Sequence, residues 1–157
     1  MTPDSDNGPI VLLVEDEPQM CKFLRASLTS HGYRMVEART AAEAQALATS
    51  HNPEIVLLDL GLPDGDGITL TRSLREWMHA PIIVVSARGQ ESAKVAALDA
   101  GADDYVTKPF GVNELLARMR VALRHAQAVP AGEPVFELGE LSLDRARRRV
   151  TVAGKEL

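Results

Sequence analysis

Apolar residues in this chain occur in short continuous runs that are separated by longer amphipathic stretches. Three runs, Ile10–Val14, Ile55–Leu58 and Ile82–Val85, consist of aliphatic residues without a polar interruption. A strand that is apolar on both faces is typical of a parallel sheet covered on both sides. Tyr33–Glu37 and Asp104–Thr107 are shorter strand predictions. The pattern therefore predicts five strands, at least three of them buried on both faces.

The stretches between these runs repeat their apolar residues at helical intervals. Helices are predicted over Pro18–Ser30, Thr40–Thr49, Gly67–Trp77, Gln90–Ala100 and Val112–Ala126. The apolar faces are predicted to carry Met20, Phe23, Leu24 and Leu28 in the first helix and Leu70, Leu74 and Trp77 in the third. Thr40, with Glu43 three residues later, has the spacing of a capping box.

Strict alternation of five strands with five helices indicates an α/β fold. Short links and right-handed crossovers leave few topologies. Strand periodicity alone does not distinguish a flavodoxin-type order from a Rossmann order, and the choice between them rests on the residues at the strand ends. We predict a doubly wound parallel sheet of flavodoxin type, in strand order 2-1-3-4-5.

The ends of the chain differ in composition from its middle. Residues 1–9 are polar and are expected to form a flexible tail, whereas 10–127 form the α/β domain. The segment 128–134 contains two prolines and a glycine and is predicted to be a linker. Residues 135–157 alternate apolar and polar side chains, which predicts short strands with no helix after them.

Composition excludes several classes of protein. The 157 residues include 17 Lys and Arg against 22 Asp and Glu, so a net charge of −5 gives no reason to expect nucleic-acid binding by the bulk of the chain. The lone Cys21 excludes a disulfide framework within the chain, and we expect it to be a small apolar residue on a helix. No apolar run approaches a membrane span of roughly 20 residues, and we expect a cytoplasmic protein with no membrane partner.

Polar residues that could bind a ligand or take part in a reaction follow four of the predicted strands. Glu15 and Asp16 follow the first, Asp59 the third, Ser86 the fourth and Lys108 the fifth. In a doubly wound sheet, ligands bind beyond the carboxyl ends of the strands, and strands one, three, four and five are contiguous in the predicted order. We therefore expect these side chains to meet in one crevice.

The residue types in that crevice indicate a hard cation. Crowded carboxylates repel one another unless a cation joins them, and oxygen ligands without His or Cys favour Mg²⁺ or Ca²⁺. A lysine and a hydroxyl nearby suit phosphate oxygens, which leaves Asp59 as a carboxylate nucleophile. Taken singly, each residue has an ordinary explanation: the acids after the first strand as a helix cap, Ser86 as a capping hydroxyl, and Lys108 as part of a turn.

Several segments of the chain together resemble the receiver domain of bacterial two-component response regulators. The resemblance covers about 10–124 and is carried by Val14–Glu17, Leu58–Gly67, Ser86–Arg88 and Gly101–Phe110. The last block is similar to the winged-helix output (OmpR/PhoB) subfamily. Leu60–Gly67, Ala97–Ala100 and Phe110–Gly111 look most like the Kdp-type regulators of potassium-uptake operons.

The resemblance implies a role for each residue of the crevice. Asp59 matches the phosphoacceptor, and Asp16, Asp59 and the carbonyl of Gly61 would bind Mg²⁺, with Glu15 acting directly or through water. The remaining matches are Lys108 with the family's lysine, Ser86 and Tyr105 with the switch pair, and Pro109 with a proline after a cis peptide. Gly61 replaces a larger residue of many relatives, but only its carbonyl is used.

The resemblance also implies a dimer face on the fourth helix, the fifth strand and the fifth helix. The matching charged residues are Lys94, Asp103, Asp104, Glu114, Arg118 and Arg120. Lys94 with Glu114, and Asp104 with Arg118, are candidate pairs between subunits. The alternative is a solvated surface, because exposed ion pairs contribute little. His125 stands where relatives often carry a second arginine.

These observations favour a switch rather than an enzyme. A sensor histidine kinase would phosphorylate Asp59, and phosphorylation would promote a homodimer that controls transcription, by the resemblance that of potassium-transport genes. One alternative is a Mg²⁺-dependent phosphohydrolase with an Asp nucleophile, but no acid follows Asp59 before Asp64 and no cap insertion is present. A second alternative is a stand-alone receiver that acts by protein contact.

The last predicted segment, 135–157, looks like the first strands of a winged-helix DNA-binding domain, truncated before its recognition helix. Specific readout of DNA usually needs an element that enters the major groove. We therefore expect promoter DNA to be a partner of the full-length parent protein only.

Overall fold

The computed structural model describes residues 8–128. The chain divides into two compact units, Met1–Ala126 and Gln127–Leu157. The predicted strands at 135–157 and most of the predicted N-terminal tail lie outside the described residues. Of the predicted linker 128–134, the first residue belongs instead to the last helix, which ends at Ala128, and the remainder lies outside the described residues.

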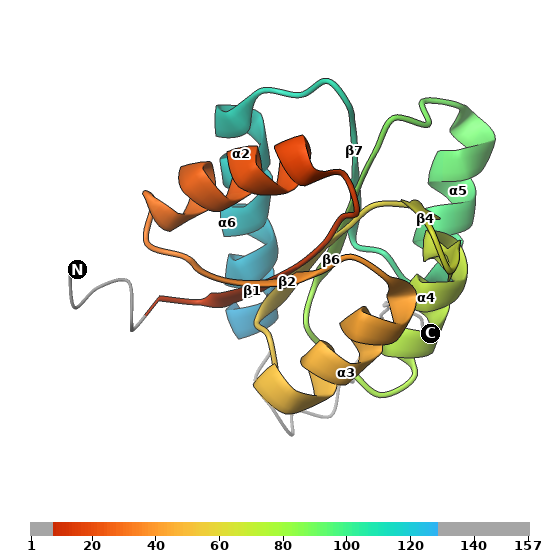
Figure 1. The fold of residues 1–157 in the computed structure, drawn as a ribbon, viewed down its shortest axis with the longest axis horizontal. Helices are drawn as coiled ribbons and strands as arrows, with labels where there is room; N and C mark the ends of the chain where they lie inside the picture. The colour runs from red at the N-terminus through yellow and green to blue at the C-terminus, as the bar shows by residue number, and fades with distance from the viewer. Residues whose placement is uncertain (1–7, 129–157) are drawn as a thin grey trace. The chain divides into compact units, whose positions relative to one another are not determined.

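The core of the fold is one parallel sheet whose strands follow the order β2-β1-β3-β6-β7. All four strand pairings are parallel. This is the predicted flavodoxin-type order, which is confirmed (Figure 1). The strands are β1 (Ile10–Val14), β2 (Arg34–Ala38), β3 (Ile55–Leu58), β6 (Ile82–Ser86) and β7 (Asp104–Thr107).

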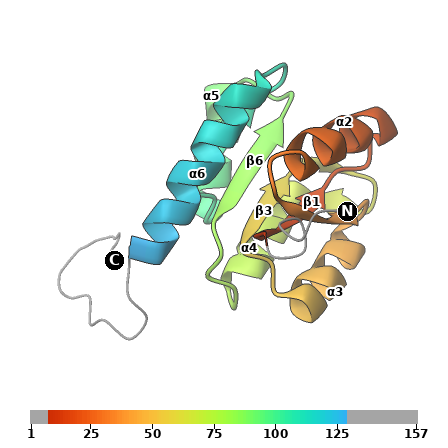
Figure 2. The same cartoon turned by 90° about the vertical axis from the view of Figure 1, so that its left-hand side faces the viewer.

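Five helices cover the two faces of the sheet. They are α2 (Pro18–Thr29), α3 (Ala41–His51), α4 (Gly67–Arg75), α5 (Glu91–Ala100) and α6 (Val112–Ala128). Helices α2 and α6 pack on one face, and α3, α4 and α5 pack on the other (Figures 1 and 2). None of the helices within 8–128 is long and apolar enough to cross a membrane.

Alternate residues of each central strand supply the two halves of the core. In β1, Leu12 and Val14 pack toward α3 and α4, whereas Val11 and Leu13 pack toward α2 and α6. Successive side chains of a strand point to opposite faces, so a sheet covered on both sides needs apolar residues at every position. This requirement explains the uninterrupted aliphatic runs.

The start of α3 has the cap that the sequence predicts. The Thr40 hydroxyl accepts a hydrogen bond from the Glu43 N–H at 3.0 Å. The Glu43 carboxylate reaches back to the N–H of Arg39, 2.7 Å away. The first bond satisfies an N–H group that the helix itself leaves without a partner, and the second joins the residue before the N-cap to the first turn of the helix.

Two aromatic residues predicted to be in the core are exposed instead. The side chain of Phe23 is 45% exposed, because the buried stripe of α2 consists of Cys21, Leu24 and Leu28 and Phe23 projects from the opposite side. Trp77 is also 45% exposed: α4 ends at Arg75, and in the segment after it Met78, not Trp77, packs in the core. The prediction that these two side chains pack in the core is wrong.

A small hairpin follows β3 that the sequence pattern does not reveal. Strands β4 (Gly61–Leu62) and β5 (Gly65–Asp66) pair antiparallel, with Gly61 opposite Asp66. Two-residue strands are too short to show a period, which explains why no strand was predicted here.

Candidate functional site

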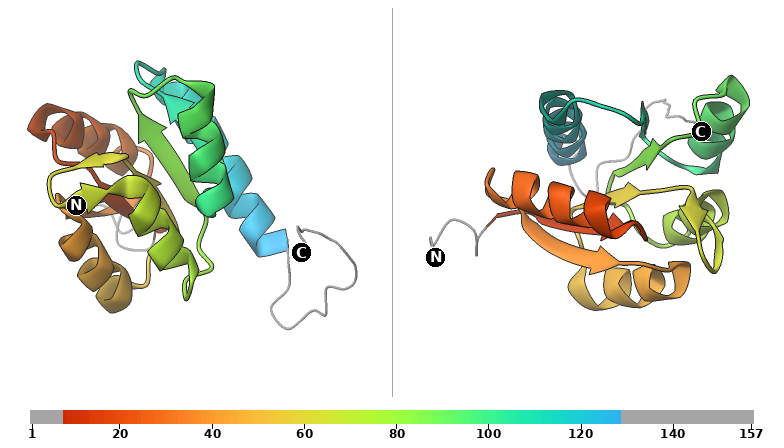
Figure 3. Two further views of the ribbon diagram at one scale, coloured as in Figure 1. Left: turned by 90° about the vertical axis from the view of Figure 1, so that its right-hand side faces the viewer. Right: turned by 45° about the horizontal axis from the view of Figure 1, so that its top comes forward.

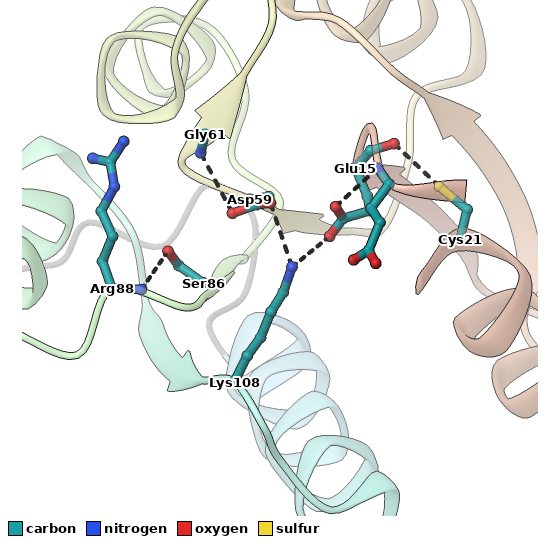
Figure 4. Close-up of polar contacts among 8 residues, drawn as sticks. Glu15, Cys21, Asp59, Gly61, Ser86, Arg88 and Lys108 are labelled. Carbon is teal, nitrogen blue, oxygen red and sulfur yellow. Dashed lines mark hydrogen bonds and ion pairs between the residues drawn. The ribbon is translucent and has the colours of Figure 1, made fainter. Parts of the chain in front are cut away.

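Four strand ends bring the predicted residues to one edge of the sheet (Figure 4). Glu15 follows β1, Asp59 follows β3, Ser86 ends β6 and Lys108 follows β7. Backbone bonds hold neighbouring ends in register, from the Asp59 N–H to the Val14 carbonyl at 3.0 Å and from the Lys108 N–H to the Ser86 carbonyl at 2.8 Å. The expectation that these side chains converge is confirmed, and the cause is the strand order β1-β3-β6-β7.

Lys108 lies between two carboxylates. Its Nζ is 2.9 Å from Oε1 of Glu15 and 3.4 Å from Oδ2 of Asp59. The side chains are only 15% exposed for Lys108, 3% for Glu15 and 15% for Asp59. Low exposure reduces screening by water, so these charges interact more strongly than a surface pair does.

Burial and charge change the protonation equilibria of this trio. Burial raises the pKa of Glu15, and the nearby charge of Asp59 raises it further, while the hydrogen bond from Lys108 opposes the shift. For Lys108, burial acts to lower the pKa, but the bond to Glu15 and the charge of Asp59 outweigh it and the pKa is raised. Lys108 is therefore a fixed positive charge at neutral pH.

Three carboxylates form a cluster that fits a metal ion. One oxygen atom from each of Glu15, Asp16 and Asp59 lies within 4.8 Å of the other two. Lys108 supplies one positive charge against three negative charges, so the cluster retains an excess that a divalent cation would neutralise. The donors are all oxygen, which suits Mg²⁺ or Ca²⁺. Glu17 is the N-cap of α2 and its side chain makes no capping bond, but the Glu15 carboxylate accepts a hydrogen bond from the Glu17 N–H at 3.2 Å, so Glu15 also contacts the start of this helix.

Ser86 and Tyr105 meet at the backbone of Arg88. The Ser86 hydroxyl accepts a hydrogen bond from the Arg88 N–H at 3.1 Å, and the Tyr105 hydroxyl donates to the Arg88 carbonyl at 2.6 Å. Ser86 is 2% exposed, and in Figure 4 it lies on the side of Asp59 away from Glu15. The sequence paired Ser86 with Tyr105 but assigned no part to Arg88. Its contribution comes from the backbone, which no side-chain pattern records.

Gly61 contacts Asp59 from the start of the small hairpin. Its N–H donates to Oδ1 of Asp59 at 3.4 Å. A Cβ atom on Gly61 would meet nothing within 4 Å, so the larger residue of many relatives would fit here too. The peptide bond between Lys108 and Pro109 is cis, as the resemblance implied.

A further contact of the site comes from Cys21. Its thiol donates to the carbonyl of Glu15 at 3.1 Å, and both residues are buried. Burial raises the pKa of Cys21, which keeps the thiol protonated and able to donate. The expectation of a small buried residue on a helix is confirmed, but the bond to Glu15 had no signal in the sequence.

Several charged residues of the predicted dimer face already have partners within the chain. Asp103 pairs with Arg75 at 2.8 Å, Asp104 with Arg118 at 2.9 Å, and Glu114 with Arg118 at 3.2 Å. Arg118 is held strongly enough by Asp104 that its pKa is raised. Lys94 is half-buried on α5, and Arg120 and His125 are exposed on α6.

A family comparison agrees with this geometry. The sequence model of the response regulator receiver domain family matches residues 11–120 of this chain. The chain belongs to this family. It is 51% identical to the KDP operon transcriptional regulatory protein KdpE of Escherichia coli K12, over 88% of this chain and 61% of that protein. It is 49% identical to KdpE of Mycobacterium tuberculosis H37Rv, over 94% of this chain and 66% of that protein. The chain thus spans less than two thirds of the length of these relatives.

Solved receiver structures share the fold. The BeF3-activated receiver domain of Klebsiella pneumoniae RstA superposes with a TM-score of 0.71 at 33% identity, over 73% of this chain and 98% of that one. The non-phosphorylated HemR receiver of Leptospira biflexa gives 0.68 at 30% identity, over 73% and 94%.

Proposed function

We propose that this chain is the receiver part of a KdpE-like regulator, in which Asp59 accepts a phosphoryl group from the phosphohistidine of a sensor kinase. One observation carries this proposal: the Asp59 carboxylate lies within one cluster with two further acids and within 3.4 Å of the Lys108 ammonium. This arrangement joins a carboxylate nucleophile to the positive charge that a phosphoryl group needs.

The transfer follows from the side chains that surround Asp59. A carboxylate oxygen attacks phosphorus, the bond from phosphorus to the histidine nitrogen breaks, and the freed imidazole takes a proton from solvent. Lys108 holds a positive charge beside the new phosphoryl oxygens, and the Ser86 hydroxyl donates to one of them. A Mg²⁺ ion held by Glu15, Asp16, Asp59 and the Gly61 carbonyl would offset the charge of the phosphoryl oxygens.

The switch acts through the Arg88 backbone. Ser86 accepts from its N–H, and Tyr105 donates to its carbonyl. When the Ser86 hydroxyl turns toward a phosphoryl group, the segment after β6 moves with it, and the Tyr105 bond carries the change to β7.

Phosphorylation would then promote a homodimer through α5, β7 and α6. The face carries Lys94, Asp103, Asp104, Glu114, Arg118 and Arg120. Its charges are of both signs, and Val95 and Leu98 expose apolar area on α5. The names of the KdpE relatives, one of them a KDP operon transcriptional regulatory protein, support control of transcription and a regulator rather than a phosphohydrolase. By the family resemblance of the sequence, the controlled genes would be those of potassium transport, and the full-length protein would bind their promoter.

The test is intact-mass measurement after incubation with a small phosphodonor and Mg²⁺. We expect the wild type to gain the mass of one phosphoryl group and Asp59→Asn to gain none, because an amide is not a nucleophile here. Asp99→Asn is the matched control, since Asp99 is exposed on α5 and outside the cluster. Phosphorylation of Asp59→Asn to the wild-type level would disprove the assignment.

A further inference from the structure

Asp64 joins two parts of the fold that are distant in the sequence. It lies in the turn between β4 and β5, yet its carboxylate accepts hydrogen bonds from the start of α3. The N–H of Ala41 is 2.7 Å from Oδ1, and the N–H of Ala42 is 3.1 Å from Oδ2. These N–H groups have no partner inside the helix, so Asp64 satisfies two of them from a loop more than 20 residues away.

The hairpin that carries Asp64 also carries a predicted metal ligand. Gly61 is the first residue of β4, is paired with Asp66 of β5, and donates its N–H to Asp59. The position of the Gly61 backbone therefore depends on the position of the hairpin.

The hairpin is fastened at its base and at its tip. At the base, the Gly67 N–H donates to the Leu60 carbonyl at 2.8 Å, and Asp66 caps α4 through the Ile68 N–H. At the tip, the two bonds from Asp64 fasten the turn to α3. Without them the hairpin is held only by the contacts at its base and by the pairing of two-residue strands, which are too short to hold a conformation by themselves.

We propose that Asp64 is a positioning residue of the metal site, because its bonds to α3 hold the β4–β5 hairpin and thereby the Gly61 carbonyl. The inference rests on the proposed function, in which that carbonyl binds Mg²⁺. Groups that orient metal ligands without touching the metal commonly change affinity by about 10- to 100-fold when they are removed.

The simpler explanation is that Asp64 only caps α3. A variant of Thr40 distinguishes the two explanations. Thr40 caps the same end of α3 from the position directly before the helix, by accepting a hydrogen bond from the Glu43 N–H. Thr40→Ala weakens the start of α3 without removing a bond to the hairpin. Asp64→Ala weakens the same helix end and frees the tip of the hairpin.

The experiment measures Mg²⁺ affinity by calorimetry and the urea midpoint of unfolding for the full 157-residue chain. Asp64→Ala is expected to bind Mg²⁺ about tenfold more weakly than wild type. Thr40→Ala is expected to lower the urea midpoint and to keep wild-type Mg²⁺ affinity. Asp64→Asn keeps an acceptor oxygen without the charge and is expected to bind more tightly than Asp64→Ala.

Three outcomes would overturn the inference. Wild-type Mg²⁺ affinity in Asp64→Ala would leave the proposed function intact and reduce Asp64 to a helix cap. Equal losses in Asp64→Asn and Asp64→Ala would attribute the effect to charge. Absence of Mg²⁺ binding by the wild type would remove the proposed metal site and the inference together. If Asp64→Ala does not fold, Asp64→Asn against Thr40→Ala gives the comparison, with weaker binding expected in Asp64→Asn alone.

Discussion

At the carboxyl end of the sheet, the single positive charge of Lys108 does not balance the negative charge of the three carboxylates near it. Glu15, Asp16 and Asp59 lie within one cluster, and a single ammonium group contacts two of them. Burial raises the pKa of Glu15, so its ionised form is maintained at a cost. A bound cation is expected to offset this cost by neutralising part of the negative charge. Phosphorylation of Asp59 is therefore expected to depend on metal binding.

Gly67 approaches the backbone of Asp59 more closely than a side chain allows. A Cβ atom there would lie 2.5 Å from the Asp59 carbonyl oxygen and 2.6 Å from the Leu60 Cα. We predict that Gly67→Ala lowers the free energy of unfolding by about 1 to 3 kcal/mol, the usual cost of overpacking. Urea denaturation measures this change, and phosphorylation of Asp59 should slow as its backbone shifts.

Gly65→Ala is the control for this prediction. Gly65 lies two residues before Gly67, in β5, but a Cβ atom there would meet nothing within 4 Å. Equal stability losses in the two variants would mean that close approach to Asp59 is not the cause.

At the level of elements, α3 is capped from two directions. Thr40 caps it from the preceding residue, and Asp64 from the hairpin after β3. The bonds from Ala41 and Ala42 hold the pKa of Asp64 below its ordinary value of 3.8. The ionised carboxylate is thus favoured more in the folded protein than in the unfolded chain.

This shift predicts the pH dependence of stability at the start of α3. A depressed folded pKa contributes stability that is present above pH 3.8 and is lost as the pH falls through the folded pKa. The difference in unfolding free energy between wild type and Asp64→Asn should therefore be constant near neutral pH and shrink in acid. Urea titrations across this range measure it, and a difference that does not change with pH would contradict the assignment.

Arg75, the last residue of α4, connects the end of this helix to neighbouring segments. Its guanidinium donates to the carbonyls of Met78, Ala80 and Gly101 and to the Asp103 carboxylate, which also accepts from the Ile82 N–H. A planar group with five donors suits such a junction. Asp103 therefore has a structural part within the chain in addition to the predicted one at the dimer face.

At the scale of the whole molecule, α5 and α6 flank the edge strand β7 from opposite faces of the sheet (Figure 3). Val95 and Leu98 on α5 are 48% and 46% exposed. Protein interfaces commonly have an apolar centre and a polar rim, and these two side chains with the charged residues around them fit that arrangement.

We predict that a phosphoryl mimic such as beryllofluoride, with Mg²⁺, shifts this chain from monomer to dimer in sedimentation experiments. Leu98→Asp should abolish the shift, because it places a charge in the centre of the predicted interface. Phe23→Asp is the control, since Phe23 is equally exposed on α2, across the sheet from α5. A wild type that stays monomeric at high protein concentration would count against the dimer.

Local pattern was sufficient for the fold class. Aliphatic runs without a polar break predicted parallel strands covered on both faces, and the residues at the strand ends, not the alternation with helices, favoured the flavodoxin-type order that the structure has. Because the carboxyl ends of parallel strands share one edge, Glu15, Asp59, Ser86 and Lys108 were expected together from their positions alone, and they lie together.

Other features depend on contacts between segments that no local pattern relates. The bond from Asp64 to α3 and the pairing of Asp103 with Arg75 join residues 23 and 28 positions apart. The exposure of Phe23 depends on which stripe of α2 faces the sheet, and its i,i+3 spacing from Met20 did not distinguish the two sides. A short-range pattern specifies which elements form and which of their ends meet. The hydrogen bonds that hold a loop, and the face that a helix buries, are decided by the packing of the whole chain.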